Sequence, residues 1–311
     1  MKDFAYLQPA TLAEVLEILR ERGTGARLVA GGTDLLVKMK RRVLAPPCLV
    51  SLRGVRELDF LEIGPDGLRI GALTTLATLA KHPGVRQVYP VLAATAAKMA
   101  SSQVRNLATV GGNLCNAAPS ADLAPPLIAL DAAVIIQGRQ GIRRVALEQF
   151  FTGPGTSILN PDEVVTEITL PFPVEGTRAV YLKHGIRKAM DIATVGVAVK
   201  IRPLKNDNAS ERRTSDGHLQ ANIDDKWEAR VVLGAVAPTP LRVQAAETFA
   251  AGGFDRDNIL RAATAAAEAA RPIDDVRSSA FYRKEMVRVL VKRALETCWG
   301  GEDNARSAET P

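Results

Sequence analysis

Apolar positions along the first part of the chain change spacing from one segment to the next. Positions 12, 15, 16 and 19 are apolar at helical spacing behind Thr11, and Glu14 completes the pattern of a capping box. An apolar strand follows at 27–30, then two glycines, a second helical stretch and an extended run at 48–52. This order predicts a β-α-β-α-β unit over about the first 55 residues.

The next hundred residues combine a hairpin with helices and a stretch of small residues. Residues 60–73 alternate between apolar and polar around a Pro-Asp-Gly turn, which predicts a hairpin. Residues 102–122 are small and polar, and we expect them to form a loop. The other elements predicted here are a helix starting at Thr74 or Thr75, a helix at 89–101, and strands at 127–137 and 164–170.

The pattern changes beyond Pro173, and we place a domain boundary near residue 174. A polar insert at 205–228 is expected to form a mobile hairpin tip, and a polar tail at 300–311 is expected to fray. The other predicted elements are strands at 179–182, 195–201 and 229–236, followed by helices that start near Thr239, at 259 and at 281. This half is therefore expected to be an antiparallel sheet with helices.

Composition narrows the class of protein. The 311 residues are enough for about two domains, and a net charge of +6 without a long single-sign block does not imply nucleic acid. Cys48, Cys115 and Cys298 are three widely spaced cysteines without a C-x-x-C pair, so they predict neither a disulfide framework nor a four-thiolate metal site, and a reducing cytoplasm fits best. The chain shows neither a signal peptide nor a membrane-spanning run, so we expect a cytoplasmic protein without a membrane span.

Two strand-then-glycine segments carry the candidate chemistry. They are VAGGTDLL at 29–36 and TVGGNLCNAAPSADLAP at 109–125. Adjacent glycines let backbone N–H groups approach an anion because no Cβ blocks them. Each pair alone is more often an ordinary turn, but two in one domain fit a long ligand with a central diphosphate. Thr109 and Asn113 add side-chain donors, and Asp122 adds an acceptor.

Four motifs together resemble one known family. They are AGGTDLL, TVGGN with PSADLAPPLIALDA, the Lys183-x-x-x-Arg187-x-x-x-Asp191-Ile-Ala pattern, and LGAVAPTPLR at 233–242. In this order they are similar to the FAD-binding medium subunit of molybdenum hydroxylases. That group includes the flavoprotein subunits of carbon monoxide dehydrogenase, xanthine dehydrogenase and 4-hydroxybenzoyl-CoA reductase. The resemblance extends over about residues 3 to 295.

The resemblance implies an α+β fold. It has a two-lobed FAD-binding domain of the vanillyl-alcohol oxidase (PCMH) type at 1–174, with lobes of about 1–56 and 57–174, and a C-terminal domain at 175–299 with a three-stranded antiparallel sheet and helices. Lys183 would lie near the flavin ring as a favourable cation, and Leu159 would make an apolar contact there. The implied FAD contacts are Val29, Ala30, Gly31, Gly32, Thr33, Asp34, Leu35, Thr109, Gly111, Gly112, Asn113, Asp122, Leu159 and Lys183.

The implied function is electron transfer within an oxidoreductase complex. A large subunit with a molybdenum cofactor and a small subunit with two [2Fe-2S] clusters would be the partners, in an (αβγ)2 assembly with a soluble acceptor. We expect no catalytic residue and no metal in this chain. The alternatives are a self-sufficient flavin oxidase or reductase of the same fold and a non-catalytic nucleotide-binding module.

Departures from the family pattern narrow these expectations. Residues 114–131 lack the cysteine-bearing insertion of the 4-hydroxybenzoyl-CoA reductase branch, so a [4Fe-4S] cluster is not expected beside Cys115. None of His82, His184 and His218 lies in a glycine segment, so a covalent histidyl-flavin is not expected either.

Overall fold

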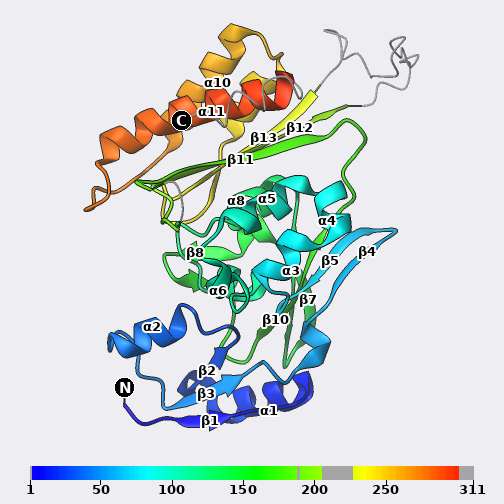
Figure 1. Ribbon diagram of the computed structural model, residues 1–311, viewed down its shortest axis with the longest axis vertical. Coiled ribbons are helices and arrows are strands. Elements are labelled where there is room, and N and C mark those ends of the chain that lie inside the picture. The colour runs from blue at the N-terminus through cyan, green and yellow to red at the C-terminus, as the bar shows by residue number, and fades with distance from the viewer. Residues whose placement is uncertain (1, 188–189, 205–226, 301–311) are drawn as a thin grey trace.

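The structure is a computed structural model that describes residues 2–187, 190–204 and 227–300. It is a mixture of helices and strands, as predicted. Three units, each a sheet with its helices, follow one another along the longest axis, from the N-terminal unit to the C-terminal one (Figure 1). The predicted mobile insert at 205–228 and frayed tail at 300–311 lie outside the described ranges except at their inner ends, where Trp227 and Glu228 begin a strand and Gly300 ends a helix.

The N-terminal unit is the predicted β-α-β-α-β arrangement, with a parallel sheet in the order β1-β3-β2. Thr11 caps its first helix by accepting a 3.2 Å hydrogen bond from the Glu14 N–H. The side chains of Val15, Leu19 and Val50 are buried between helix and sheet. Its elements are β1 (Ala5–Leu7), α1 (Leu12–Arg22), β2 (Ala26–Val29), α2 (Leu35–Lys40) and β3 (Cys48–Ser51).

The middle unit is a five-stranded antiparallel sheet in the order β4-β5-β10-β6-β7. Its strands are β4 (Leu61–Gly64), β5 (Gly67–Gly71), β6 (Ala133–Gly138), β7 (Gly141–Ala146) and β10 (Val164–Leu170). The helices of this unit are α3 (Leu76–Lys81), α4 (Pro83–Val88), α5 (Pro90–Lys98), α6 (Ser102–Arg105), α7 (Val110–Cys115) and α8 (Ala124–Ala129). The predicted hairpin is β4-β5, and Thr75 caps α3.

Two predictions for this unit were wrong. The expected loop at 102–122 contains α6 and α7, because the hydroxyls of Ser101 and Thr109 cap two short helices despite the small residues around them. The expected strand at 127–137 begins as the end of α8 and becomes β6 only at Ala133. A continuous apolar run does not distinguish a buried helix from a buried strand. The strands β7, β8 (Phe151–Gly153) and β9 (Thr156–Ser157) were not predicted.

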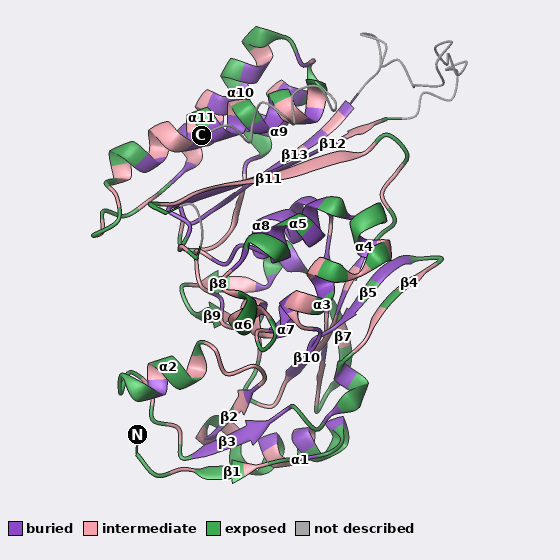
Figure 2. Cartoon of the chain, in the orientation of Figure 1, coloured by how far each residue is buried: buried purple, intermediate pink, exposed green. Residues whose placement is uncertain are grey.

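The C-terminal unit packs its sheet on one side against α5 and α8 of the middle unit. The sheet is antiparallel in the order β11-β12-β13-β14. The first three strands are the predicted ones, and a fourth strand of only two residues adds to the edge at β13. Figure 2 shows buried residues along β12 and β13 and on α11, whereas β11 is of intermediate burial. The elements are β11 (Arg178–His184), β12 (Val195–Pro203), β13 (Trp227–Gly234), β14 (Leu241–Arg242), α9 (Gln244–Ala251), α10 (Arg256–Ala269) and α11 (Ala280–Gly300). Among the described helices, none has the length and apolar character needed to cross a bilayer.

Candidate cofactor-binding site

The two glycine segments line one cavity of about 660 Å³. It is formed by the β2-α2 connection, α7 and the stretch around residues 155–165, which are far apart in the sequence. Its volume lies in the range of small-molecule and cofactor sites. Every predicted contact residue except Asp122 and Lys183 lines it, namely Val29, Ala30, Gly31, Gly32, Thr33, Asp34, Leu35, Thr109, Gly111, Gly112, Asn113 and Leu159.

The first glycine segment presents unpaired backbone donors to the cavity. Within the described residues, no protein acceptor is found for the N–H groups of the four residues from Gly31 to Asp34. Gly32 has φ +75°, a conformation that glycine adopts without strain and that occurs in the backbone turns that bind anions. These four residues all line the cavity, so it offers a row of donors suited to an anion.

The second glycine segment contributes side chains rather than free amides. The Gly111 N–H donates to the carbonyl of Ala72 at 3.0 Å, and the Gly112 N–H donates to Oγ1 of Thr109 at 3.0 Å. In contrast, the Oδ1 atom of Asn113 is buried without a hydrogen-bond partner among the described residues. Free amides are expected from the sequence in both segments, and they are found in the first one only.

The absence of a Cβ at two glycines allows the chain to pack closely around the cavity. A Cβ on Gly31 would lie 1.9 Å from the carbonyl oxygen of Leu107, and one on Gly111 would lie 2.7 Å from both the carbonyl oxygen and the Cβ of Ala72. A side chain at Gly111 would therefore meet Ala72, so this glycine is needed for packing behind the cavity.

Lys38 and Asn116 join the two sides of the cavity and were not found from the sequence. Nζ of Lys38, on α2, donates to Oδ1 of Asn116, just after α7, at 2.7 Å. Both residues line the cavity. Lys38 follows Asp34 by four residues and therefore lies on the same side of the helix. This spacing is the only local sequence feature that could have identified Lys38 as a cavity residue.

Asp122 and Lys183 lie together outside the cavity lining. Oδ2 of Asp122 accepts from Nζ of Lys183 at 2.7 Å, and Oδ1 accepts from the hydroxyl of Tyr181 at 2.8 Å. The Lys183 ammonium also donates to the carbonyl of Asp191 at 2.7 Å. Burial first, and the Asp122 carboxylate second, raise the pKa of Tyr181 well above its usual value, so this hydroxyl stays a donor. Gly196 leaves space for it, since a Cβ there would lie 2.5 Å from the Tyr181 oxygen.

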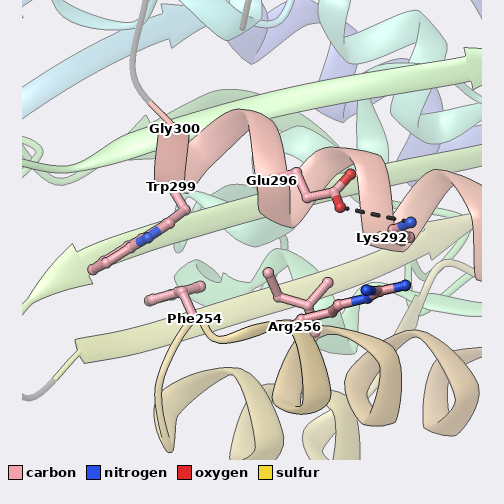
Figure 3. Close-up of a pocket in the computed structure, with 7 residues that line it drawn as sticks. Phe254, Arg256, Lys292, Glu296, Trp299 and Gly300 are labelled. Atoms are coloured by element: carbon pink, nitrogen blue, oxygen red, sulfur yellow. Dashed lines mark ion pairs between the residues drawn. The ribbon is translucent and has the colours of Figure 1, made fainter. Parts of the chain in front are cut away.

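A second cavity, of about 370 Å³, lies between α10 and α11 and contains none of the predicted residues. Figure 3 shows the aromatic rings of Phe254 and Trp299 at one end, and they stack with centroids 4.6 Å apart. Lys292 and Glu296 on α11 lie 3.7 Å apart, and Arg256 also lines this cavity. The 660 Å³ cavity is the better candidate for a cofactor because it has the larger volume and is lined by both glycine segments.

The described histidines lie away from this cavity. Nδ1 of His82 accepts from the Val85 N–H at 3.3 Å, Nε2 of His184 lies 3.3 Å from the Tyr282 hydroxyl, and His218 is outside the described residues. Neither described histidine lines the 660 Å³ cavity. In the described part of the chain, no group of three or more His, Cys, Asp or Glu side chains has a geometry that could hold a metal ion.

A cavity with free amides and a lysine between two sheet units suits a phosphate-bearing ligand, and comparison with known proteins identifies the class of protein. Residues 2–173 match the FAD-binding domain in molybdopterin dehydrogenases, and residues 180–298 match the C-terminal domain of carbon monoxide dehydrogenase flavoproteins. The chain therefore belongs to the family of FAD-binding medium subunits of molybdenum hydroxylase-type dehydrogenases. This confirms the resemblance, FAD as the cofactor and the class of oxidoreductase subunits.

Relatives resemble this chain over nearly its whole length. A putative xanthine dehydrogenase FAD-binding subunit of Escherichia coli K12 is 33% identical, over 95% of this chain and 96% of the relative. The carbon monoxide dehydrogenase medium chain of Hydrogenophaga pseudoflava is also 33% identical, over 95% of this chain and 97% of the relative. A solved structure of that dehydrogenase superimposes with a TM-score of 0.88 at 32% identity, over 96% of this chain and 98% of the other. A solved structure of quinoline 2-oxidoreductase from Pseudomonas putida 86 superimposes with a TM-score of 0.84 at 28% identity. The match covers 96% of this chain and 99% of the other.

Proposed function

We propose that this chain is the electron-transfer subunit of a heterotrimeric molybdenum hydroxylase. It would receive electrons from the [2Fe-2S] clusters of a small subunit and pass them through FAD to a soluble acceptor. A large subunit would hold the molybdenum cofactor, and the assembly would be (αβγ)2 in the cytoplasm. Relatives that are medium chains of carbon monoxide dehydrogenases support this reading, because a medium chain works beside other subunits.

The domain boundaries that we propose follow the separate hydrophobic cores of the chain. Residues 1–174 would form the two-lobed FAD-binding domain of the vanillyl-alcohol oxidase (PCMH) type, with lobes of about 1–56 and 57–174, and residues 175–299 would form the C-terminal domain. Support comes from distinct buried clusters around α1 and β3, around the five-stranded sheet, and around α10 and α11.

The row of free N–H groups from Gly31 to Asp34 carries the proposal. A diphosphate presents several acceptor oxygens and two negative charges, and backbone donors without protein partners match it. Lys38 would turn from Asn116 toward the diphosphate, since both residues line the same space. Asn113 would satisfy its unpaired Oδ1 with a donor group of the dinucleotide.

FAD, when bound, supplies chemistry in which electrons are accepted and released singly or in pairs. The residues of this chain would bind and orient it. Lys183 would lie near the ring, held by Asp122 and the Asp191 carbonyl, and its positive charge would favour negative charge nearby. Tyr181 would fix the Asp122 carboxylate from the other side. The places of Asp122 and Lys183 at the cofactor remain predictions.

The state of Glu163 argues against the rival reading of a self-sufficient flavin oxidase. This carboxylate lines the cavity but accepts two hydrogen bonds from Arg143, at 2.8 and 2.7 Å, and one from the Asn160 N–H at 2.8 Å. The Arg143 guanidinium holds the pKa of Glu163 below its usual value, against the effect of burial. A carboxylate in this state is a poor general base for an organic substrate.

Purification from the native cell tests the proposal. We expect the chain to co-purify with stoichiometric molybdenum and iron, and we expect the chain alone, loaded with FAD, to be inactive on the substrate of the whole complex. Full turnover by the isolated chain would establish the self-sufficient enzyme instead. A chain that stays colourless after reconstitution with FAD would exclude both readings.

A further inference from the structure

One wall of the 660 Å³ cavity is a turn that connects β9 to β10. Residues 158–163, all of them described, form neither helix nor strand, and Leu159, Asn160 and Pro161 line the cavity. Without a helix or strand, the shape of this turn depends on the individual bonds that its backbone and side chains make. The position of Leu159 in the cavity is therefore set by the residues bonded on either side of it.

Arg143 and Glu163 form an ion pair with two parallel bonds at the end of this turn. Nε and Nη2 of Arg143 donate to the two oxygens of the Glu163 carboxylate, at 2.8 and 2.7 Å. The Glu163 side chain is only 10% exposed. A forked pair of this geometry fixes direction as well as distance, which an ordinary surface ion pair does not. The pair is therefore a fixed point beside the cavity.

Both partners of the pair also bond to the turn, one on each side of Leu159. Nη2 of Arg143 donates to the carbonyl of Ile158 at 3.2 Å, and the Glu163 carboxylate accepts from the Asn160 N–H at 2.8 Å. In addition, the Glu163 N–H donates to the Asn160 carbonyl at 3.1 Å. Leu159 thus lies between two residues that the ion pair holds directly, and a shift of its backbone would stretch one of these bonds.

The sheet of the middle unit leaves room for this pair. Arg143 is on the edge strand β7, Glu163 directly precedes β10, and β6 lies between these strands. Gly138 on β6 provides the space, since a Cβ there would lie 2.6 Å from Cγ of Glu163. The next residue on β7, Arg144, is exposed, and the alternation of a strand directs its side chain to the other face. Only Arg143 is therefore placed to make the bridge.

This wall of the cavity suits a ring system better than a diphosphate. Leu159, Val164 and Val165 line it with aliphatic side chains. The Glu163 carboxylate lines it as well, and its negative charge would repel phosphate groups. The free amides of Gly31 to Asp34, in contrast, suit the diphosphate.

We propose that Arg143 and Glu163 are positioning residues, which hold Leu159 against the flavin ring of FAD. They act through Leu159 and do not touch the reacting atoms. This inference rests on the proposed function, because it takes the bound FAD to present its flavin ring to this wall of the cavity.

Titrations of the apo-chain with FAD and, separately, with ADP test the inference. ADP carries a diphosphate but no flavin ring, so a change confined to FAD reports on the ring. We expect Arg143→Gln to raise the Kd for FAD about fourfold, as the loss of roughly one buried methylene contact would, and to leave the Kd for ADP within about twofold. Glu163→Gln should have the same effect, and it provides the test if the arginine variant does not fold.

A double-mutant cycle shows whether the pair acts through Leu159. Leu159→Ala should raise the Kd for FAD, and adding Arg143→Gln should raise it no further, because the contact that the arginine positions is then already lost. Arg143→Lys should give an intermediate Kd, since an ammonium keeps the charge but not the fork of donors. Arg144→Gln is the matched control and should bind both ligands as the unsubstituted chain does.

Other results would overturn the inference in distinguishable ways. If Leu159→Ala weakens FAD binding but Arg143→Gln and Glu163→Gln do not, the positioning role is rejected and the proposed function stands. Equal losses for FAD and ADP would reduce the pair to a structural role, and additive losses in the cycle would show that it acts independently of Leu159. An FAD affinity that Leu159→Ala leaves unchanged would reject the place of the flavin ring, and the inference with it.

Discussion

Replacing Lys38 with glutamine tests how the cavity recognises its ligand. In the structure Nζ of Lys38 lies 2.7 Å from Oδ1 of Asn116, and both residues line the cavity beside the free amides of Gly31 to Asp34. Lys38→Gln keeps a side chain that can hydrogen-bond but removes the positive charge. If the ammonium faces the diphosphate of FAD, the loss falls on the part of the ligand that carries negative charge.

The expected magnitude follows from the exposure of the site. Hydrogen bonds to charged groups contribute about 1.5–3 kcal/mol. Lys38 is only partly buried, so we take a value around the lower end of this range, about 1–2 kcal/mol, which corresponds to roughly a 5- to 30-fold change in Kd. Lys40 provides a matched control because it is on the same helix, is exposed and does not line the cavity.

The assay titrates the apo-chain with FAD and, separately, with riboflavin, and follows flavin fluorescence. Lys38→Gln should weaken FAD binding by the stated factor and leave riboflavin binding unchanged, because riboflavin has no diphosphate. Lys40→Gln should change neither value, and Lys38→Arg should restore most of the FAD affinity. Equal losses for FAD and riboflavin, or equal losses for Lys38→Gln and Lys40→Gln, would refute the assignment of Lys38 to the diphosphate.

Three further predictions concern packing and charge. Gly31→Ala should lower the thermal unfolding temperature and the FAD content together, since its Cβ would lie 1.9 Å from the Leu107 oxygen; Gly64→Ala, where nothing lies within 4 Å, is the control that should change neither. Tyr181→Phe removes the 2.8 Å donor to Asp122 and should cost about 1–3 kcal/mol in urea unfolding; an unaltered midpoint would contradict that contact. Hydrogen bonds from the Arg277 N–H and the Arg283 guanidinium lower the pKa of Asp275 to about 2. Its contribution to stability should thus be complete above its unfolded pKa of about 3.9 and be lost as pH falls toward 2. Asp275→Asn should remove this part of the acid dependence of thermal unfolding, and an identical pH profile would show that the carboxylate is not held as described.

Local signals were sufficient for much of the fold. Thr11 and Glu14 mark the start of α1 because an N-cap acts within one turn, and the alternation around Pro65 predicts β4-β5 for the same reason. The α7 helix was missed because two glycines outweighed the capping hydroxyl of Thr109 in a reading based on composition. Strand β14, of two residues, depends on the neighbouring β13 and carries no pattern of its own.

Tertiary contacts decide the parts of the site that the sequence left open. Lys38 meets Asn116 across 78 positions of sequence, and Tyr181 meets Asp122 across 59, so neither pairing has a local signature. Likewise, the amides of the second glycine segment are occupied by contacts such as the one from Gly111 to Ala72, which no spacing within the segment reveals. The sequence identified which segments line the cavity, and the packing of the units determines which atoms in them are available.

A crystal structure of this chain with FAD bound tests the central claim most directly. We expect diphosphate oxygens at about 2.7–3.2 Å from backbone nitrogens between Gly31 and Asp34, with the ammonium of Lys38 turned toward them. We also expect the amides of Gly111 and Gly112 to keep their protein partners. A diphosphate bound outside this cavity, or one that leaves the amides from Gly31 to Asp34 without a ligand acceptor, would contradict it.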